Sequence, residues 1–315
     1  MSDGGRCDSA RPSFRVCEAT PHRKLRCRAR LGSRNDYPTS NEEGFVTRRY
    51  ATRKRISHLE ETLTPRERAT IDTLDRLRVA TTEQLRRIHF ADLTARSAAR
   101  QAPALLASLA SGQVVVKLER QVGGVRAGSK AAVWSLDTIG QRLTSSCGPA
   151  GGQHRRRPWT PSLSFLAHRL AVSEVFVGLS ERERAGAVEV LDFDAEPLSW
   201  RRFTSAHGGT TYLKPDAFVR LGVGEVERAA FVEIDRDTES RSTLAVKLRA
   251  YRQYWETGRE QERRGYFPRV VFAVPSEERK AVLVDLFGSQ PTETWPLWQV
   301  VLADDLTNAL IGGKP

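Results

Sequence analysis

Three acidic residues near the ends of two predicted strands are the best candidates for chemistry in this 315-residue sequence. Asp216 lies on a strand predicted over residues 211–221, and Glu233 and Asp235 end an apolar strand predicted over 229–234. Because side chains alternate along a strand, Glu233 and Asp235 should point to the same face. Three converging carboxylates supply the oxygen ligands that Mg²⁺ or Mn²⁺ prefers. Such a cation activates water and stabilises the phosphate in phosphodiester hydrolysis, so the pattern predicts a metal site for DNA cleavage.

Further charged side chains could complete such a site. Glu174, on a helix predicted over 162–179, could join the cation or orient a water molecule bound to it. Clustered carboxylates repel one another unless a cation lies among them. Lys247, one turn into a helix predicted over 242–255, is the first candidate for that ammonium, and Lys214 is a weaker one.

The same acidic residues also have a purely structural interpretation. Arg236 or Arg241 could pair with Asp235 or Glu239, and the strand could simply end in solvent. In that case the carboxylates would form ordinary ion pairs and hold no metal.

Tyr251 and Tyr254 raise a third hypothesis, a relaxase that attacks DNA through a tyrosine. Such enzymes hold their metal with a histidine triad, and the six histidines of this sequence include no His-x-His pair. Both tyrosines also follow Leu248 at helical spacing. We therefore interpret them as packing residues.

The acidic pattern resembles the PD-(D/E)xK nuclease superfamily, in which a helix supplies Glu, one strand supplies Pro-Asp and the next supplies Glu-x-Lys. The matching residues here are Glu174, Pro215-Asp216 and Glu233-Ile234-Asp235. The resemblance implies a restriction-endonuclease-like sheet flanked by helices, and a Mg²⁺ or Mn²⁺ cofactor. Asp235 stands where the superfamily has the lysine that orients the attacking water. The resemblance therefore implies a degenerate nuclease, or an active one whose lysine comes from elsewhere in the chain.

The wider arrangement resembles the Replication-relaxation family of bacterial plasmid and mobile-element proteins, over residues 63–287. That family joins a winged N-terminal module to a domain with a Pro-Asp strand, a Glu-x-Asp-Arg segment and a Lys-Leu-x-x-Tyr helix. The matching segments are His168-Arg169-Leu170-Ala171-Val172, Lys214-Pro215-Asp216-Ala217, Phe231-Val232-Glu233-Ile234-Asp235-Arg236, Thr238-Glu239-Ser240 and Lys247-Leu248-Arg249-Ala250-Tyr251. The resemblance implies a role in plasmid replication or DNA relaxation, with double-stranded DNA and plasmid replication or mobilisation proteins as partners.

Residues 162–315 should form the nuclease-like domain that positions these side chains. Helices are predicted over 162–179, 242–255, 277–287 and 305–310, and strands over 188–193, 211–221, 229–234, 269–274 and 298–302. This order predicts an α/β or α+β domain with a mixed sheet flanked by helices.

Residues 57–143 should form a DNA-binding module with a different pattern. Three helices are predicted over about 65–79, 83–90 and 94–109, followed by strands over 114–120 and 131–136 with a glycine-rich loop between them. Thr64, Pro65 and Glu67 form a typical helix start, and Gly112 a typical helix end. Three short helices before such a hairpin are typical of a winged helix-turn-helix.

The third helix of a winged helix-turn-helix enters the major groove, where Arg can bind guanine and Ser or Thr can reach bases or phosphates. The exposed residues expected there are Thr94, Arg96, Ser97 and Arg100. The wing would offer Arg120, Arg126 and Lys130 to the DNA. The alternatives are a winged helix that binds protein, and a transcriptional regulator whose C-terminal domain only mediates assembly.

The net charge of the chain is +12, and it is unevenly distributed. Residues 1–56 carry 14 Lys and Arg against 6 Asp and Glu, a net of +8, and residues 57–143 carry 13 against 9, a net of +4. The remaining residues are balanced. Excess positive charge attracts polyanions, so nucleic acid is the first partner to expect. We give the excess of Arg over Lys no functional weight, because a GC-rich genome also produces it.

Residues 1–56 are predicted to be a disordered basic tail or a translation-start artefact, and residues 144–161 a linker.

Cys7, Cys17 and Cys27 are ten residues apart and no CxxC occurs, which favours free cytosolic thiols over a zinc site. No run of 18 apolar residues occurs, so we expect a cytoplasmic protein with no membrane span. Because winged modules often pair on DNA, a homodimer is an open alternative.

Overall fold

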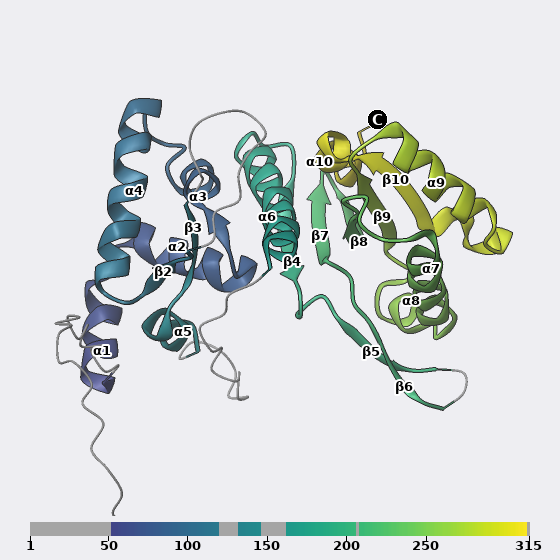
Figure 1. Cartoon of the computed structure of the whole chain (residues 1–315), viewed down its shortest axis with the longest axis horizontal. Coiled ribbons are helices and arrows are strands. Elements are labelled where there is room, and N and C mark those ends of the chain that lie inside the picture. The colour runs from purple at the N-terminus through teal and green to yellow at the C-terminus, as the bar shows by residue number, and fades with distance from the viewer. Residues whose placement is uncertain (1–51, 120–131, 146–161, 206–207, 314–315) are drawn as a thin grey trace, which may run out of the picture. The chain divides into compact units, whose positions relative to one another are not determined.

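The computed structural model describes residues 52–119, 132–145, 162–205 and 208–313, all of which belong to one compact unit (Figure 1). The predicted tail up to residue 51, and most of the predicted linker and wing, lie outside the described residues. The DNA contacts expected of Arg120, Arg126 and Lys130 lie there too and stay predictions. The described residues form a mixed α/β protein, with a helical N-terminal part and a C-terminal part built on a five-stranded sheet.

Within the described residues, the N-terminal part consists of helices and short strands. In chain order they are α1 (Arg53–Thr62), α2 (Pro65–Leu77), β1 (Ala80–Thr81), α3 (Thr82–His89), α4 (Ala95–Ser111), β2 (Val115–Lys117), β3 (Val133–Leu136) and α5 (Thr138–Ser145). The hydroxyl of Thr64 accepts a hydrogen bond from the backbone N–H of Glu67, whose carboxylate accepts one from the N–H of Thr64. Helix α2 therefore begins at the predicted capping box. Thr94 caps α4 and Gly112 ends it, so both predicted end signals are confirmed, although the helix runs two residues beyond the predicted 109.

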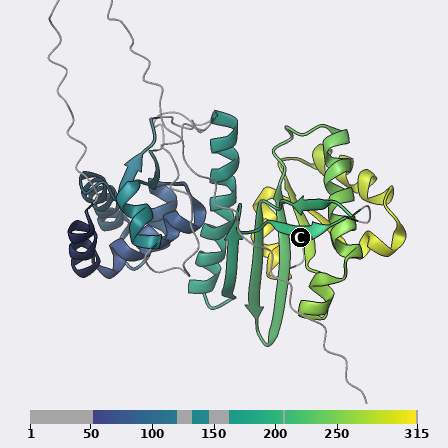
Figure 2. The same ribbon diagram turned by 90° about the horizontal axis from the view of Figure 1, so that it is seen from below.

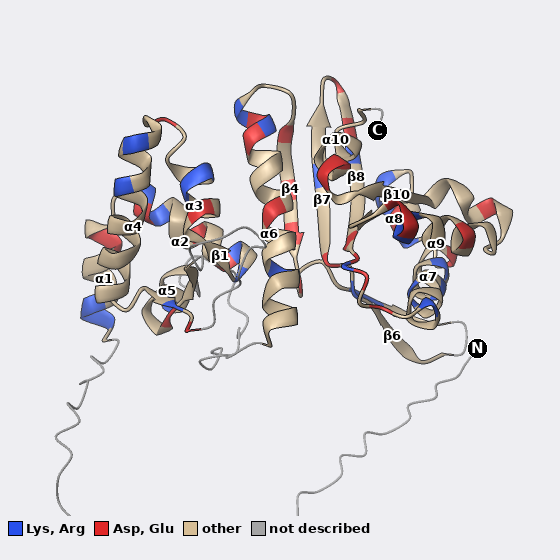
Figure 3. Cartoon of the chain, turned by 45° about the horizontal axis from the view of Figure 1, so that its top comes forward, with Lys and Arg blue, Asp and Glu red and all other residues tan. Residues whose placement is uncertain are grey.

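Strand β3 lies between β1 and β2 and is antiparallel to both. Apolar side chains from the helices and strands of the N-terminal part form a common core. Its buried members include Ile71, Leu74, Leu85, Leu106, Leu109, Val114, Trp134, Leu136, Ile139 and Leu143. Removal of these side chains from water is the main force that holds the helices together. Helix α4 carries arginines but no lysine, and blue segments mark these arginines on its ribbon in Figure 3.

Three N-terminal elements differ from the sequence predictions. Helix α1 begins at Arg53, before the order predicted from residue 57, and its Arg55 guanidinium donates hydrogen bonds to the carbonyl of Gly112 (2.8 Å) and to Oε1 of Gln113 (3.1 Å). This contact fixes α1 to the end of α4. Strand β1 and helix α5 were not predicted, because a strand of two residues and a helix of eight are too short to show a clear hydrophobic period.

The C-terminal part begins with a long helix and continues in nearly the predicted order. Its elements are α6 (Leu163–Arg184), β4 (Glu189–Ala195), β5 (Arg201–Thr204), β6 (Thr210–Leu213), β7 (Ala217–Val223), β8 (Val226–Ile234), α7 (Arg241–Glu256), α8 (Arg259–Arg264), β9 (Arg269–Val274), α9 (Glu277–Gly288), η1 (Thr292–Leu297), β10 (Trp298–Leu302), η2 (Ala303–Asp305) and α10 (Leu306–Leu310). Strands β9 and β10 have the predicted bounds, because each is an apolar run bounded by polar or turn residues.

The strand order of the central sheet is β10-β9-β8-β7-β4. Strands β8, β9 and β10 are parallel to one another, whereas β7 is antiparallel to both β8 and β4, so the predicted mixed sheet is confirmed. Helices α6 and α10 pack on one face, and α7 and α9 pack on the other. Figure 2 shows α6, in teal, beside the strands, with green helices on the far side.

The strand predicted over residues 211–221 is in fact two strands, β6 and β7, joined by the link 214–216. Pro215 lies in this link and has no backbone N–H, so it cannot donate a hydrogen bond to a central ladder. Strand β6 pairs instead with β5 in a separate antiparallel hairpin. The prediction that Asp216 lies on a strand is therefore wrong, because it precedes β7 by one residue.

Helix α6 is long and apolar enough to cross a membrane by length and composition alone, since an 18-residue window has a mean hydropathy of 1.3. It nevertheless serves as a core helix, with 56% of that window buried. Its residues Val172, Val175, Phe176 and Leu179 belong to the core between the helix and the sheet.

Candidate functional site

Asp216 lies in the link before β7, at the end of the sheet where β8 also ends. Its Oδ2 accepts a hydrogen bond from a backbone N–H of β8 (2.7 Å), and its Oδ1 lies 2.9 Å from Nε2 of His168 on α6. The register of β7 and β8 pairs Ala217 with Val232, so Asp216 comes opposite Glu233 one step further on. The structure therefore brings the carboxylates of Asp216 and Glu233 to the same end of the sheet.

Glu233 lies in β8 beneath α7, and only 1% of its surface is exposed. The hydroxyl of Tyr251 donates a hydrogen bond to its Oε1 (2.6 Å), and Nζ of Lys247 lies 2.8 Å from its Oε2. The same ammonium lies 3.1 Å from Oε2 of Glu239. Lys247 therefore supplies a cation beside the paired carboxylates. We call these residues, with Asp216 and His168, the Asp216–Glu233 cluster.

Burial and charge shift the proton equilibria of this cluster. Burial raises the pKa of Glu233 to about 7, the Asp216 charge acts in the same direction, and Lys247 opposes both. Burial also lowers the pKa of Lys247, but the Glu233 and Asp216 charges outweigh that effect and raise it above its ordinary value. Lys247 therefore stays positively charged, whereas Glu233 can change its charge near neutral pH.

The cluster has two proton donors, His168 and Tyr251, that the sequence does not predict in this role. Burial lowers the pKa of His168, but the hydrogen bond and charge of Asp216 raise it to a value above the ordinary one. Burial raises the pKa of Tyr251 well above its ordinary value, as does the nearby Glu233 charge, so its phenol stays protonated. The only sequence signal for both was their position within the motifs of the Replication-relaxation family.

Asp235 lies on the same strand end as Glu233 but has its own partner. Its Oδ2 accepts a hydrogen bond from Nε of Arg279 on α9 (2.6 Å), and both side chains are buried. The predicted partners do not make this contact, since Arg236 donates to a backbone carbonyl of α6 and Arg241 pairs with Asp285. Arg279 is 44 residues away in sequence, so only the packing of α9 on the sheet identifies it.

The predicted site of three carboxylates around a Mg²⁺ or Mn²⁺ ion does not fit these contacts. In the part of the chain that the structure describes, no group of three or more His, Cys, Asp or Glu side chains is arranged to hold a metal ion. Arg279 engages Asp235, and Lys247 lies against Glu233. Each of the predicted ligands thus has an internal partner, and the negative charge that a divalent ion would neutralise is already matched.

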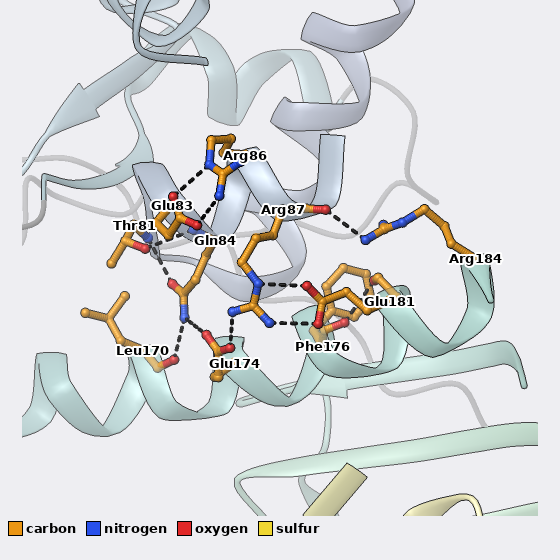
Figure 4. A network of polar contacts seen from close by, with 11 residues as sticks. Thr81, Glu83, Gln84, Arg86, Arg87, Leu170, Glu174, Phe176, Glu181 and Arg184 are labelled. Carbon is orange, nitrogen blue, oxygen red and sulfur yellow. Dashed lines mark hydrogen bonds and ion pairs between the residues drawn. The ribbon is translucent and has the colours of Figure 1, made fainter. Parts of the chain in front are cut away.

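Glu174 does not join the cluster, which corrects its predicted role. It is exposed on α6 and pairs with Arg87 of α3, whose Nε also lies 2.7 Å from Oε1 of Glu181 (Figure 4). Six residues separate Glu174 from His168, which corresponds to roughly 240° around a helix. The turn of α6 that directs His168 to Asp216 therefore directs Glu174 elsewhere.

The contacts of Glu174 belong to a polar network that joins α3 to α6 (Figure 4). Nε2 of Gln84 donates to the carbonyl of Leu170 (3.0 Å) and to Oε2 of Glu174 (3.0 Å). Nη2 of Arg184 donates to the carbonyl of Arg87 (2.9 Å). Helix α3 is thereby held against α6, and the N-terminal part is linked to the helix that carries His168.

Lys214 and Tyr254 lie apart from the cluster, whereas Tyr251 belongs both to the cluster and to the core beneath α7. Lys214, the weaker ammonium candidate, extends over the ring of Trp200, with Nζ 4.7 Å from its centroid. Tyr254 is buried and donates a hydrogen bond to Glu260 (2.8 Å), and Tyr251 is buried in the same core beneath α7. The interpretation of both tyrosines as packing residues is confirmed.

The four predicted DNA-contact residues of α4 lie at its N-terminal end. Thr94 is the N-cap, and its Oγ1 accepts a hydrogen bond from the backbone N–H of Ser97 (3.3 Å). Arg96 and Arg100 are exposed, and Ser97 is half-buried. Both arginines are therefore accessible to a ligand, while Thr94 is engaged in starting the helix.

A family model with the description Replication-relaxation matches residues 71–270, which include α3, α4 and the whole Asp216–Glu233 cluster. No curated protein and no solved structure matches the chain. Because the matched segment covers well over half of the sequence, the chain belongs to the Replication-relaxation family.

Proposed function

We propose that this protein binds double-stranded DNA through its N-terminal part and acts in the replication or relaxation of a plasmid or other mobile element. The element order α2-β1-α3-α4-β2-β3 is typical of a winged helix-turn-helix. In that motif α4 is the helix that enters the major groove. Membership of the Replication-relaxation family supports the role in replication.

The exposed face of α4 is the observation that carries this proposal. Arg96 and Arg100 are one helical turn apart and both are exposed, whereas Ala98 and Ala102 of the same helix are buried. Neither arginine forms an ion pair among the described residues. Arginines so placed can bind guanine edges or phosphates.

We further propose that the C-terminal part is a degenerate nuclease-like domain that does not cleave DNA. The order α6-β4-β7-β8-α7-β9, apart from the β5–β6 hairpin and α8, and the position of Asp216 opposite Glu233 at one end of the sheet support a restriction-endonuclease-like arrangement. The buried pair of Asp235 with Arg279 supports the loss of activity, because it leaves a neutralised carboxylate where the superfamily has its lysine.

A second candidate function is a Mg²⁺- or Mn²⁺-dependent endonuclease. The observation that favours it is the position of Lys247, whose ammonium lies beside Glu233 and interacts with the charge of Asp216. A lysine contributed by α7 could replace the one that Asp235 displaces. For this endonuclease to act, the ion pair between Lys247 and Glu233 would have to break before a cation could bind Glu233.

Binding to a labelled linear duplex, followed by a gel shift over a range of salt concentrations, tests the main proposal. We expect the full-length protein to bind the duplex, with an affinity that falls steadily as salt increases, because Lys and Arg contacts release counterions from the phosphates. Absence of any shift at low salt would remove the DNA-binding function and leave a protein-binding module.

Incubation of the full-length protein with supercoiled plasmid and Mg²⁺ or Mn²⁺ separates the two candidates. We expect the plasmid to stay supercoiled. Relaxed or linear product that disappears in Asp216→Ala and Glu233→Ala variants would contradict the degenerate domain and establish the second candidate.

A further inference from the structure

The β5–β6 hairpin has two chemically different faces. On one face, Phe203 and Leu213 are buried in the core beneath α7. Strand alternation and the pairing of Arg202 with Tyr212 place a second set of side chains on the opposite face. That set, which we call the outer face, consists of Trp200, Arg202, Thr204, Thr210, Tyr212 and Lys214, and all six residues are exposed.

The outer face combines aromatic rings with positive charge. The exposed fractions are 37% for Trp200 and 50% for Tyr212, which are high for large aromatic residues. Lys214 lies over the Trp200 ring, and Arg202 pairs directly with Tyr212 across the hairpin. None of the six outer-face residues is acidic. A surface of this composition is complementary to a ligand that has both flat apolar groups and negative charge.

We propose that the outer face binds single-stranded DNA, with bases stacked on Trp200 and Tyr212 and phosphates held by Arg202 and Lys214. Diagonal neighbours on an antiparallel pair are about 7–8 Å apart, so the two rings can each receive one base of an extended strand. Aromatic residues interleaved with cations are the usual means of binding single strands without sequence preference. In a duplex the faces of the bases are covered by their neighbours, so these rings have no equivalent use there.

The place of the hairpin in the fold connects this site to the Asp216–Glu233 cluster. Lys214 is two residues before Asp216 in the same link. The hydroxyl of Ser199, at the base of β5, donates a hydrogen bond to the carbonyl of Pro215 in that link (2.6 Å). A strand bound to the outer face would therefore lie beside the link that carries Asp216. This inference goes beyond duplex binding by α4, because it assigns a second nucleic-acid site to the C-terminal part.

Fluorescence anisotropy with a labelled 12-nucleotide oligothymidylate and full-length protein tests the inference. A Trp200→Ala/Tyr212→Ala double variant should bind this strand about 5- to 100-fold more weakly, given what one or two stacked bases contribute. The matched control is Trp295→Ala, which removes another half-exposed tryptophan, on η1. The control should retain wild-type affinity, and Trp200→Phe/Tyr212→Phe should retain most of it because both rings can still stack.

Three further measurements keep the two nucleic-acid sites distinguishable. Arg96→Ala/Arg100→Ala should lose duplex binding and keep oligothymidylate binding, so a failure of the α4 proposal does not affect this one. Equal affinity of the alanine double variant and the wild type, when circular dichroism shows both folded, would overturn the inference. It would also be overturned if polyglutamate displaced the strand from wild type and from the alanine variant alike, since binding would then depend on charge outside the outer face.

Discussion

In the N-terminal part, Arg96 and Arg100 point to solvent from α4, whereas in the C-terminal part Lys247 and Arg279 turn inward to buried carboxylates. The charge balance of the sequence follows the same division, with all of the excess positive charge before residue 144. Figure 3 shows the consequence, because blue and red lie close together around α7 and α8.

The difference shows that charge which is matched within the fold serves stability, while charge left unmatched is available to a partner. A buried carboxylate without a cation would lose several kcal/mol of solvation, so Asp235 and Glu233 need internal partners in any folded state. The arginines of α4 remain solvated and have no such requirement. Four changes to the chain test this comparison, and they are taken from the largest expected effect to the smallest.

Arg279→Met should lower the free energy of unfolding by about 3 kcal/mol, because it leaves Asp235 buried without its partner. Urea denaturation at neutral pH measures the loss. An Asp235→Leu/Arg279→Met double variant should recover much of it, since neither charge is then left alone. A single variant as stable as wild type would show that Asp235 reaches solvent and is free to bind a cation.

Arg96→Ala/Arg100→Ala should weaken duplex DNA binding at least about 30-fold, because two arginine contacts at roughly 1–3 kcal/mol each contribute at least about 2 kcal/mol together. Arg249→Ala is the matched control, since Arg249 is an exposed arginine on α7. Titration of a labelled duplex by anisotropy gives both affinities. An equal loss in both variants would mean that general charge, and not α4, provides the binding.

Glu233→Gln should remove part of the pH dependence of stability. Because the folded-state pKa of Glu233 is raised to about 7 from 4.5, its contribution is complete below pH 4.5 and is lost as the pH rises through 7. Between pH 5 and pH 8 the wild type should therefore lose up to about 3 kcal/mol relative to the variant. Thermal unfolding at several pH values measures the difference, and equal slopes for variant and wild type between pH 5 and pH 8 would show that Glu233 stays ionised beside Lys247 throughout this range.

Arg87→Ala should have the smallest effect, about 0.5–1 kcal/mol, because its ion pairs with Glu174 and Glu181 are partly exposed. Added salt should reduce the difference between variant and wild type, since screening weakens exposed pairs. Unfolding midpoints at low and high salt provide the test. A cost of several kcal/mol that salt does not change would place the α3–α6 network among the buried pairs.

Much of the fold was predictable because its signals are local. The capping box at Thr64 fixes the start of α2, and the apolar runs over 269–274 and 298–302 fix β9 and β10. The sequence does not predict β1, α5 or β5, because elements of two to eight residues are too short to show a clear hydrophobic period. The sequence predicts a continuous strand through Pro215, because the residues on both sides of the link form strands.

The candidate site was only partly predictable for a related reason. Alternation along a strand places Glu233 and Asp235 on one face, and this is a property of the backbone alone. The partners of these carboxylates cannot be predicted from the backbone of the strand, because Arg279 lies on α9 and His168 lies on α6. Glu174 was predicted to join the site because it matches the helix Glu of the nuclease superfamily. In the structure its position on α6 directs its side chain to Arg87 instead.

The sequence by itself determined the helical and strand segments, the basic character of the first half and the family motifs, because these depend on residue type and spacing over a few turns. Tertiary structure alone decided which charges meet. Ion pairing depends on which helix packs over which strand end. In this fold Lys247 pairs with Glu233 and Arg279 pairs with Asp235. Arg96 and Arg100 stay exposed to solvent.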